Sequence, residues 1–287
     1  MNPSEEEILE DLQILANRMG YKLIRLYDSD ESSETVLRMI RDHNLSIKVM
    51  LGIWLRAEIS NHEGCPWLDE PVPEEELLAN RTLNHEEIQR GIRLANEYDT
   101  VVVAVNVGNE ALVDWNDHMV PEDTVIRYVR QVRRQIMQPV TVADNYKWWA
   151  LHGRKLAGEV DFVSVHTYPV WEGKNATEAL AWSIENLLEV RQALPGATLV
   201  ITEAGWPTVA SEFANLAGEK EQWQYFSEIV EWSKKMNITT FWFEAFDEDW
   251  KGDPANPDGA EKHWGLFTTD RQPKLTAKKV MNETHRL

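Results

Sequence analysis

The sequence predicts an α/β fold, a (β/α)8 TIM barrel with a parallel sheet, in one domain spanning residues 1–287. Apolar runs of strand length alternate with longer segments in which apolar residues recur at helical spacing. Polar and aromatic residues cluster after the strands, where a barrel of this kind builds its site. The length suits a single barrel with one sizeable core.

The first helix has the clearest boundaries in the sequence. Ser4 and Glu7 form a capping box, one apolar face follows, and Gly20 ends the helix. The other helices are expected at residues 36–41, 86–97, 125–136, 180–194, 223–236 and 274–284. Each of them precedes or follows an apolar run, as the units of a barrel require.

Seven strands are expected, at residues 22–27, 47–55, 101–110, 140–143, 160–165, 199–203 and 239–246. A closed barrel needs an eighth strand, and residues 1–3 are too few to supply it before the first helix. Either the barrel is open or the sequence lacks its natural first strand, and we hypothesise that an N-terminal segment is missing. The proline-containing segment 56–84 is expected to fold over the barrel mouth.

The charge of the chain restricts its partners. A formal net charge of −19 and a pI near 4.8 argue against nucleic acid and against anionic membrane surfaces, which such a surface would repel. A neutral substrate is expected, and the chain is expected to be a monomer. Thirteen tryptophans suit such a substrate, because an apolar ring face stacks on the C–H face of a sugar.

The chain offers no pattern for a metal or another cofactor. Cys65 is the only cysteine, so neither a disulfide within the chain nor a cysteine metal cluster can form. His166 has no companions at metal-ligand spacing, and we interpret it as a structural residue or as one that supports a site residue. The acidic start MNPSEEE is not a signal peptide. We expect an exported protein, periplasmic or extracellular, if a leader has been removed, and a cytoplasmic one otherwise.

Two of the predicted strands end in a glutamate, Glu110 and Glu203. They lie 93 residues apart, about three barrel units of roughly 31 residues each, so both belong on the same face of one barrel. A single strand-end glutamate is more often a salt-bridge partner than a catalyst, but paired carboxylates on that face suggest glycoside cleavage.

Five short runs resemble glycoside hydrolase family 17. They are VGNE at 107–110, VHTYPVWEG at 165–173, ITEAGWPT at 201–208, FWFEAFDEDWKG at 241–252 and HWGLF at 263–267. That family comprises β-1,3-glucan-active enzymes of a clan of retaining (β/α)8 glycosidases, and the similarity runs along essentially the whole chain. Asp249 stands where the resemblance leads us to expect proline, which is predicted to change a loop and not the chemistry.

The resemblance implies roles for four residues. Glu110 would be the acid/base and Glu203 the nucleophile, at the separation of roughly 5–5.5 Å that retention requires. Asn109 resembles the residue of the clan that hydrogen-bonds the sugar 2-hydroxyl, and Tyr168 resembles the tyrosine that orients the nucleophile. No cofactor is implied.

The remaining candidates for substrate binding follow predicted strands. They are Arg25, Tyr27, Trp54, Trp115, Asn145, Trp171, Trp206, Glu244 and Trp250. We expect two or three of Trp54, Trp171, Trp206 and Trp250 to contact sugar. Glu244 has two open interpretations: it binds sugar, or it holds Lys251 or Arg25 in a charge network.

The sequence therefore predicts a retaining glycoside hydrolase that cleaves laminarin-type β-1,3-glucan through a covalent glycosyl-enzyme. A β-1,3-glucanosyltransferase is the first alternative, because water and a second sugar compete for the same intermediate. A glucan-binding barrel without activity is the second, and retention of both glutamates argues against it.

Overall fold

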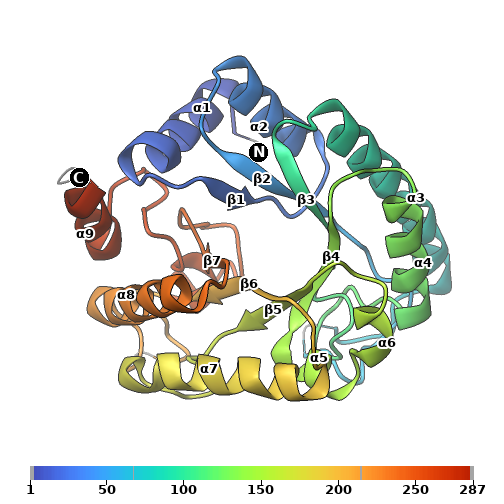
Figure 1. Ribbon diagram of the computed structural model, residues 1–287. Coiled ribbons are helices and arrows are strands. Elements are labelled where there is room, and N and C mark those ends of the chain that lie inside the picture. Colours follow the sequence, from blue (N-terminus) through green and yellow to red (C-terminus); the bar gives the residue numbers. More distant parts are fainter. Residues whose placement is uncertain (1–2, 67, 214, 285–287) are drawn as a thin grey trace. The chain divides into compact units, whose positions relative to one another are not determined.

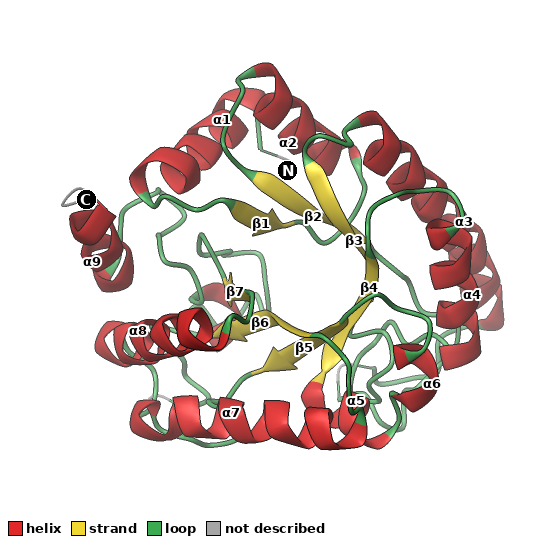
Figure 2. Ribbon diagram, in the orientation of Figure 1, coloured by secondary structure: helices red, strands yellow, loops and turns green. Residues whose placement is uncertain are grey.

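The computed structural model of the chain describes residues 3–66, 68–213 and 215–284. Within them, seven strands follow one another in the sheet in chain order, so the predicted number of strands is confirmed. The fold is the predicted (β/α)8 barrel lacking one strand, and the alternation of strands and helices can be followed in Figures 1 and 2. The strands are β1 (Leu23–Arg25), β2 (Lys48–Ile53), β3 (Val102–Asn109), β4 (Val140–Asn145), β5 (Val163–Thr167), β6 (Leu199–Gly205) and β7 (Thr240–Phe243).

The helices agree with the predicted ones in order, and most begin earlier. They are α1 (Glu5–Gln13), α2 (Glu31–Asp42), α3 (Glu74–Glu97), α4 (Glu122–Arg133), α5 (Tyr146–Leu151), α6 (Arg154–Ala157), α7 (Ala176–Ala193), α8 (Glu219–Met236) and α9 (Leu275–Thr284), with a π-helix η1 (Ile14–Arg18) and a 3-10 helix η2 (Ala260–Lys262). The segment after β4, for which no helix was predicted, forms α5, which Asn145 caps by accepting the Lys147 amide hydrogen at 2.8 Å.

The N-terminal helix confirms the predicted capping box. The Ser4 amide donates to Glu7 Oε2 at 2.8 Å, and the Glu7 amide donates to Ser4 Oγ at 3.2 Å. These reciprocal bonds satisfy two of the amide groups that the first turn of a helix leaves without partners. Gly20 has φ +72°, a left-handed conformation that glycine adopts without steric cost, as its predicted role at the end of the helical segment requires.

Helix α3 corrects the prediction for segment 56–84. The helix begins at Glu74, so the connection that follows β2 ends at Pro73. Pro73 precedes the first turn, and Glu74, Glu75 and Glu76 lie in it, where their charges favour the positive end of the helix dipole. The prediction relied on apolar spacing, which is weak here because Leu78 is exposed to solvent. Trp67, part of the same predicted loop, lies outside the described residues.

The chain divides into two compact units. One domain over residues 1–287 stays a prediction, because both ends of that range lie outside the described residues. The first unit comprises the chain up to Gln13, Tyr21–Val165 and Val190–Leu199. In it β1, β2, β3 and β4 pair in parallel, α3 packs on β2 and β3, and α4 packs on β3 and β4. Strand β2 is apolar and buried from Val49 to Ile53, as expected of a parallel strand covered on both faces.

The second unit comprises Ile14–Gly20, His166–Glu189 and the chain from Val200 onward. Here β6 and β7 pair in parallel, and α8 packs against β7 and α9. Its core contains a fully buried amide, Gln222, whose Nε2 donates to the carbonyl oxygens of Trp206, Trp264 and Gly265 at 3.0, 3.2 and 3.2 Å. One side chain of α8 thus fixes the backbone that follows β6 and the backbone around Trp264. No helix among the described residues is long and apolar enough to cross a membrane.

Candidate active site

In the first unit, the ends of β1 and β3 bring three predicted residues together. Arg25 Nη2 donates to Asn109 Oδ1 at 2.5 Å, and the Arg25 guanidinium lies 4.4 Å from the centre of the Tyr27 ring. Arg25 therefore orients the Asn109 amide, while its own plane is supported by an aromatic face. This arrangement leaves the Asn109 amide nitrogen as the group that can donate to a ligand.

Glu110 follows β3 in an unusual backbone conformation. Its φ is +46°, which for a residue other than glycine costs on the order of 1–2 kcal/mol. The β3–β4 register is irregular between Asn106 and Asn109, so a bulge precedes the glutamate. The Glu110 backbone amide donates to the Ala143 carbonyl at 2.9 Å, and the Asn116 side-chain nitrogen Nδ2 donates to the Glu110 carbonyl at 3.1 Å. The strand end therefore bends at the residue predicted to be the acid/base.

Three further residues contact this strand end and were not predicted as site residues: Asn116 and His118 of the loop after Glu110, and the fully buried Asp144 of β4. Asp144 Oδ2 accepts the Leu112 amide hydrogen at 3.1 Å, and His118 Nε2 lies 2.9 Å from the Asn109 carbonyl oxygen. The His118 ring also contacts the ring of Trp54, with centres 4.5 Å apart. Nothing in the sequence around His118 indicated its contact with a residue nine positions earlier.

In the second unit, the carboxylate of Glu203 is held on both oxygens. The residue is 5% exposed, the Tyr168 hydroxyl donates to Oε2 at 2.6 Å, and His166 Nε2 lies 3.3 Å from Oε1. Tyr168 therefore contacts the carboxylate that it was predicted to orient. His166 was expected to be structural or to support a site residue, and it contacts the predicted nucleophile directly. Strand periodicity could have revealed it, because residues 166 and 168 are two positions apart.

Aromatic rings surround Tyr168 in the same unit. Its ring lies 5.2 Å from Trp264 and 6.0 Å from Phe243, and Trp264 also lies 6.2 Å from Trp171. Trp171 is 48% exposed and presents a face to solvent, whereas Trp264 is 1% exposed and supports its neighbours. Trp264 belongs to the HWGLF run and was not predicted as a site residue.

Trp206 requires a correction. It is 0% exposed, its Nε1 donates to the Leu216 carbonyl at 3.0 Å, and its ring packs against Tyr225. A ring without exposed surface cannot stack on a sugar, so Trp206 is a core residue. It directly follows a strand, but the sequence alone does not tell whether the side chain of such a residue points into the core or towards solvent.

Glu244 follows β7 and pairs with Lys251, one of its two predicted interpretations. Glu244 Oε2 lies 2.9 Å from Lys251 Nζ, which also pairs with Glu248 and lies 4.5 Å from the centre of the Phe243 ring. Burial raises the pKa of Glu244 well above its usual value, against the lowering effect of Lys251. Burial disfavours the Lys251 ammonium, but the charges of Glu244 and Glu248 outweigh it and raise the pKa of this lysine. Glu244 Oε1 is buried without a hydrogen-bond partner among the described residues.

Of the other predicted binding residues, Trp54 and Asn145 lie at the ends of β2 and β4, and Trp115 and Trp250 lie in the loops that follow β3 and β7. Trp115 and Trp250 are 41% and 72% exposed, and Trp54 is partly buried with its amide donating to Glu87 Oε1 at 3.3 Å. Asn145 uses its side-chain oxygen to cap α5. All these placements are compatible with substrate contacts, which stay predictions.

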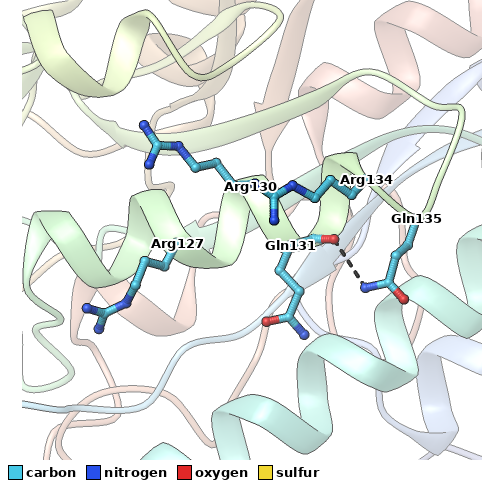
Figure 3. Close-up of a pocket in the computed structure, with 5 residues that line it drawn as sticks. All are labelled: Arg127, Arg130, Gln131, Arg134 and Gln135. Carbon is cyan, nitrogen blue, oxygen red and sulfur yellow. Dashed lines mark hydrogen bonds between the residues drawn. The ribbon is translucent and has the colours of Figure 1, made fainter.

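A pocket of about 530 Å³ lies on α4 and the residues just after it, and none of the predicted site residues lines it. Figure 3 shows its lining, Arg127, Arg130, Gln131, Arg134 and Gln135. Arg130 donates to both carboxylate oxygens of Glu159, at 2.9 and 2.6 Å. This exposed, cationic helix face lacks the aromatic rings that bind a neutral sugar.

Comparisons with known proteins give one family model, several relatives and solved structures of the same fold. A model of the BtgE/BtgC glycoside hydrolase domain matches residues 2–265. A glucan 1,3-beta-glucosidase of Arthroderma benhamiae is 27% identical over 91% of this chain and 81% of its own length. The chain covers 40% of the length of its relatives from Aspergillus flavus and Aspergillus oryzae.

Two solved structures share the fold. An endo-laminarinase from Formosa Hel1_33_131 has a TM-score of 0.86 and 25% identity, over 99% of this chain and 83% of that one. A glycoside hydrolase family 17 β-1,3-glucanosyltransferase from Rhizomucor miehei has a TM-score of 0.74 and 22% identity, over 96% of this chain and 91% of that one. The second likeness shows the fold alone.

Proposed function

The chain belongs to the BtgE/BtgC glycoside hydrolase family, and from this premise we propose that it cleaves laminarin-type β-1,3-glucan with retention of configuration. This membership agrees with the predicted resemblance to glycoside hydrolase family 17, a structure of which shares the fold. Its relative in Arthroderma benhamiae is named a glucan 1,3-beta-glucosidase, and its structural neighbour from Formosa an endo-laminarinase, which supports β-1,3-glucan as the substrate.

The environment of Glu203 is the observation that carries the proposal. A nucleophilic carboxylate must be ionised and must point at the anomeric carbon. Burial alone would favour its neutral form, and a hydrogen bond donated to the carboxylate favours the charged form. The Tyr168 hydroxyl supplies that bond at 2.6 Å, and His166 lies 3.3 Å from the other oxygen. A carboxylate held in this way cannot rotate without losing both contacts.

The proposed reaction has two steps. In the first, Glu110 donates a proton to the glycosidic oxygen while Glu203 attacks the anomeric carbon, so that the sugar–oxygen bond breaks and a glycosyl ester forms on Glu203. In the second, Glu110 removes a proton from water, and the water oxygen displaces Glu203 from the same carbon. Two inversions give net retention. A second sugar hydroxyl in place of water would give transglycosylation.

Substrate contacts are proposed for groups that remain available on each unit. The exposed rings of Trp115, Trp171 and Trp250 suit the apolar faces of glucose, and Trp54 adds a partly buried ring. Glu244 Oε1, which has no hydrogen-bond partner in the described part of the chain, suits a sugar hydroxyl, because a buried acceptor that stays unpaired is costly. A neutral substrate also agrees with the net charge of −19.

Trapping the intermediate tests the mechanism. Incubation with a 2-fluoro-laminaribiosyl fluoride should add one disaccharide mass to the protein, and peptide mapping should place it on Glu203. Glu203→Gln should show no adduct, whereas Glu231→Gln, a glutamate of exposed surface on α8, should be labelled like the unmodified protein. Adduct on another residue, or rapid turnover of linear β-1,3-glucohexaose without any adduct, would contradict the proposal.

The products of β-1,3-glucohexaose distinguish hydrolysis from transfer. We expect shorter oligosaccharides, detected by mass spectrometry over time. Species longer than the input would identify a glucanosyltransferase acting through the same intermediate. An unchanged hexaose would contradict the proposed substrate.

A further inference from the structure

The backbone at Asn109 and Glu110 is held by side chains that the reaction scheme does not use. Glu110 has φ +46°, so the direction in which its side chain leaves β3 depends on keeping an uncommon conformation. Its amide is fixed by the Ala143 carbonyl at 2.9 Å. Its carbonyl needs a donor as well, because an extended strand no longer provides one at this bend.

Asn116 and His118 supply donors to this strand end. Asn116 Nδ2 donates to the Glu110 carbonyl oxygen at 3.1 Å, and His118 Nε2 lies 2.9 Å from the Asn109 carbonyl oxygen. A carbonyl only accepts hydrogen bonds, so His118 donates to it when Nε2 carries the proton; the same nitrogen also lies 3.2 Å from Asn116 Nδ2, which brings the two side chains together. Its Nδ1 lies 2.9 Å from Asp117 Oδ1, and its ring contacts Trp54. The ring is therefore held on three sides.

The connection after β2 holds Asn116 in turn. Asn61 Nδ2 donates to the carbonyl oxygens of Asn116 and of Asp114, the latter at 2.9 Å. The amides of Glu58 and Ile59 donate to the Met119 carbonyl at 3.0 and 3.3 Å. The segment 114–119 is thus tied at both ends to residues 58–61, which are more than 50 positions away in the sequence.

We propose that Asn116 and His118 are positioning residues for the acid/base, and that the hydrogen bonds of Asn61 hold the segment that carries them. They set the backbone from which the Glu110 carboxyl group is aimed, and they do not touch the reacting atoms. This inference rests on the proposed function, because it assigns to Glu110 the proton transfer of a retaining glycosidase. If the side chains that donate to these two carbonyl oxygens are lost, the Glu110 carboxyl group is still present, but it should protonate the leaving oxygen less well.

A series of leaving groups tests this inference. Aryl β-laminaribiosides from dinitrophenyl to phenyl differ in how much acid assistance their departure needs. In Asn116→Asp, which keeps the shape of the side chain and loses the donor, kcat/KM should fall by about tenfold to a hundredfold for phenyl and for glucan. For the dinitrophenyl substrate, kcat/KM should stay within a few-fold of that of the unmodified protein. The dependence of kcat/KM on the leaving group therefore becomes steeper in the variant.

Three further variants make the result decisive. Asn61→Ala should show the same steepening to a smaller extent. His118→Ala should lose activity on glucan, and His118→Gln, which keeps a donor near Nε2, should recover part of it. Asn96→Ala is the matched control, because Asn96 also donates to two backbone carbonyls, those of Ile92 and Gln135, but on the outer side of α3. It should match the unmodified protein.

Two outcomes would overturn the inference. Equal losses for all leaving groups would mean that the variants only reduce the amount of folded enzyme, and unchanged kinetics in Asn116→Asp would mean that the bond does not position Glu110. If the unmodified protein and Asn96→Ala both leave β-1,3-glucan and aryl laminaribiosides intact, the proposed function fails instead. Circular dichroism of each variant separates misfolding from either result.

Discussion

The ends of β6 and β3 hold their glutamates in two different ways. At the end of β6, the side chain of Glu203 is fixed, with Tyr168 and His166 on its two oxygens and 5% of the residue exposed. At the end of β3, the main chain of Glu110 is fixed, through its amide and its carbonyl. A nucleophile must stay ionised and point at the anomeric carbon, and an acid/base must be directed at the glycosidic oxygen and then at water. The contacts of the Glu203 carboxylate and of the Glu110 backbone suit these two proposed roles.

Removing the side chain of Glu110 should have the largest effect on this comparison. In Glu110→Ala, kcat/KM for glucan should fall by about 10²- to 10⁴-fold, the usual contribution of general acid catalysis. For dinitrophenyl laminaribioside, whose departure needs no proton, the first step should lose far less. Steady-state and burst kinetics on both substrates measure this, with Glu231→Gln as the surface control. A loss of the same size on both substrates would remove the distinction between the two strand ends.

Removing the hydroxyl of Tyr168 should have a smaller effect with a different pattern. A hydrogen bond to a charged group is worth about 1.5–3 kcal/mol, so Tyr168→Phe should lower kcat/KM by about tenfold to a hundredfold. The loss should be equal for glucan and for dinitrophenyl laminaribioside, because both need the nucleophile. Tyr225→Phe is the matched control, since the Tyr225 hydroxyl bonds with Ser183 at 2.7 Å in the buried core. A loss confined to glucan would argue that Tyr168 assists the acid instead.

The smallest expected effect concerns the pH dependence of stability near Glu110. The hydrogen bond from His118 holds the pKa of Asp117 below its ordinary value of 3.8. Because the folded pKa is the lower one, the stabilisation is present above pH 3.8 and is lost as the pH falls through the folded value. Asp117→Asn should therefore be less stable at pH 6 by under about 1 kcal/mol, since the side chain is half exposed, and the difference should vanish in strong acid.

Urea unfolding at pH 6 and at about pH 2 measures the effect of Asp117→Asn. Asn96→Ala, which removes no carboxylate, serves as the control for effects of pH on the fold as a whole. An Asp117→Asn variant that is equally destabilised at both pH values would contradict this prediction, because the charge of Asp117 would then not contribute to the free energy of unfolding.

Local sequence was sufficient wherever the interacting groups are neighbours along the chain. The capping box of Ser4 and Glu7 spans three residues, and the Gly20 stop needs only its own φ. The alternation of apolar runs gave seven strands, and the strand ends gave Glu110 and Glu203 as candidates. The missed first half of α3 belongs here too, because Pro73 and three glutamates marked its start.

The chain by itself determined the class of fold, the order of its elements and the family to which it belongs. Tertiary structure alone decided which tryptophan is buried and which is exposed, as Trp206 and Trp171 demonstrate. It also decided that His166 contacts Glu203 and that Asn61 holds Asn116 across 55 positions. The physical reason is that periodicity and capping act over a few residues, whereas burial and donor–acceptor pairing depend on segments that only folding brings together.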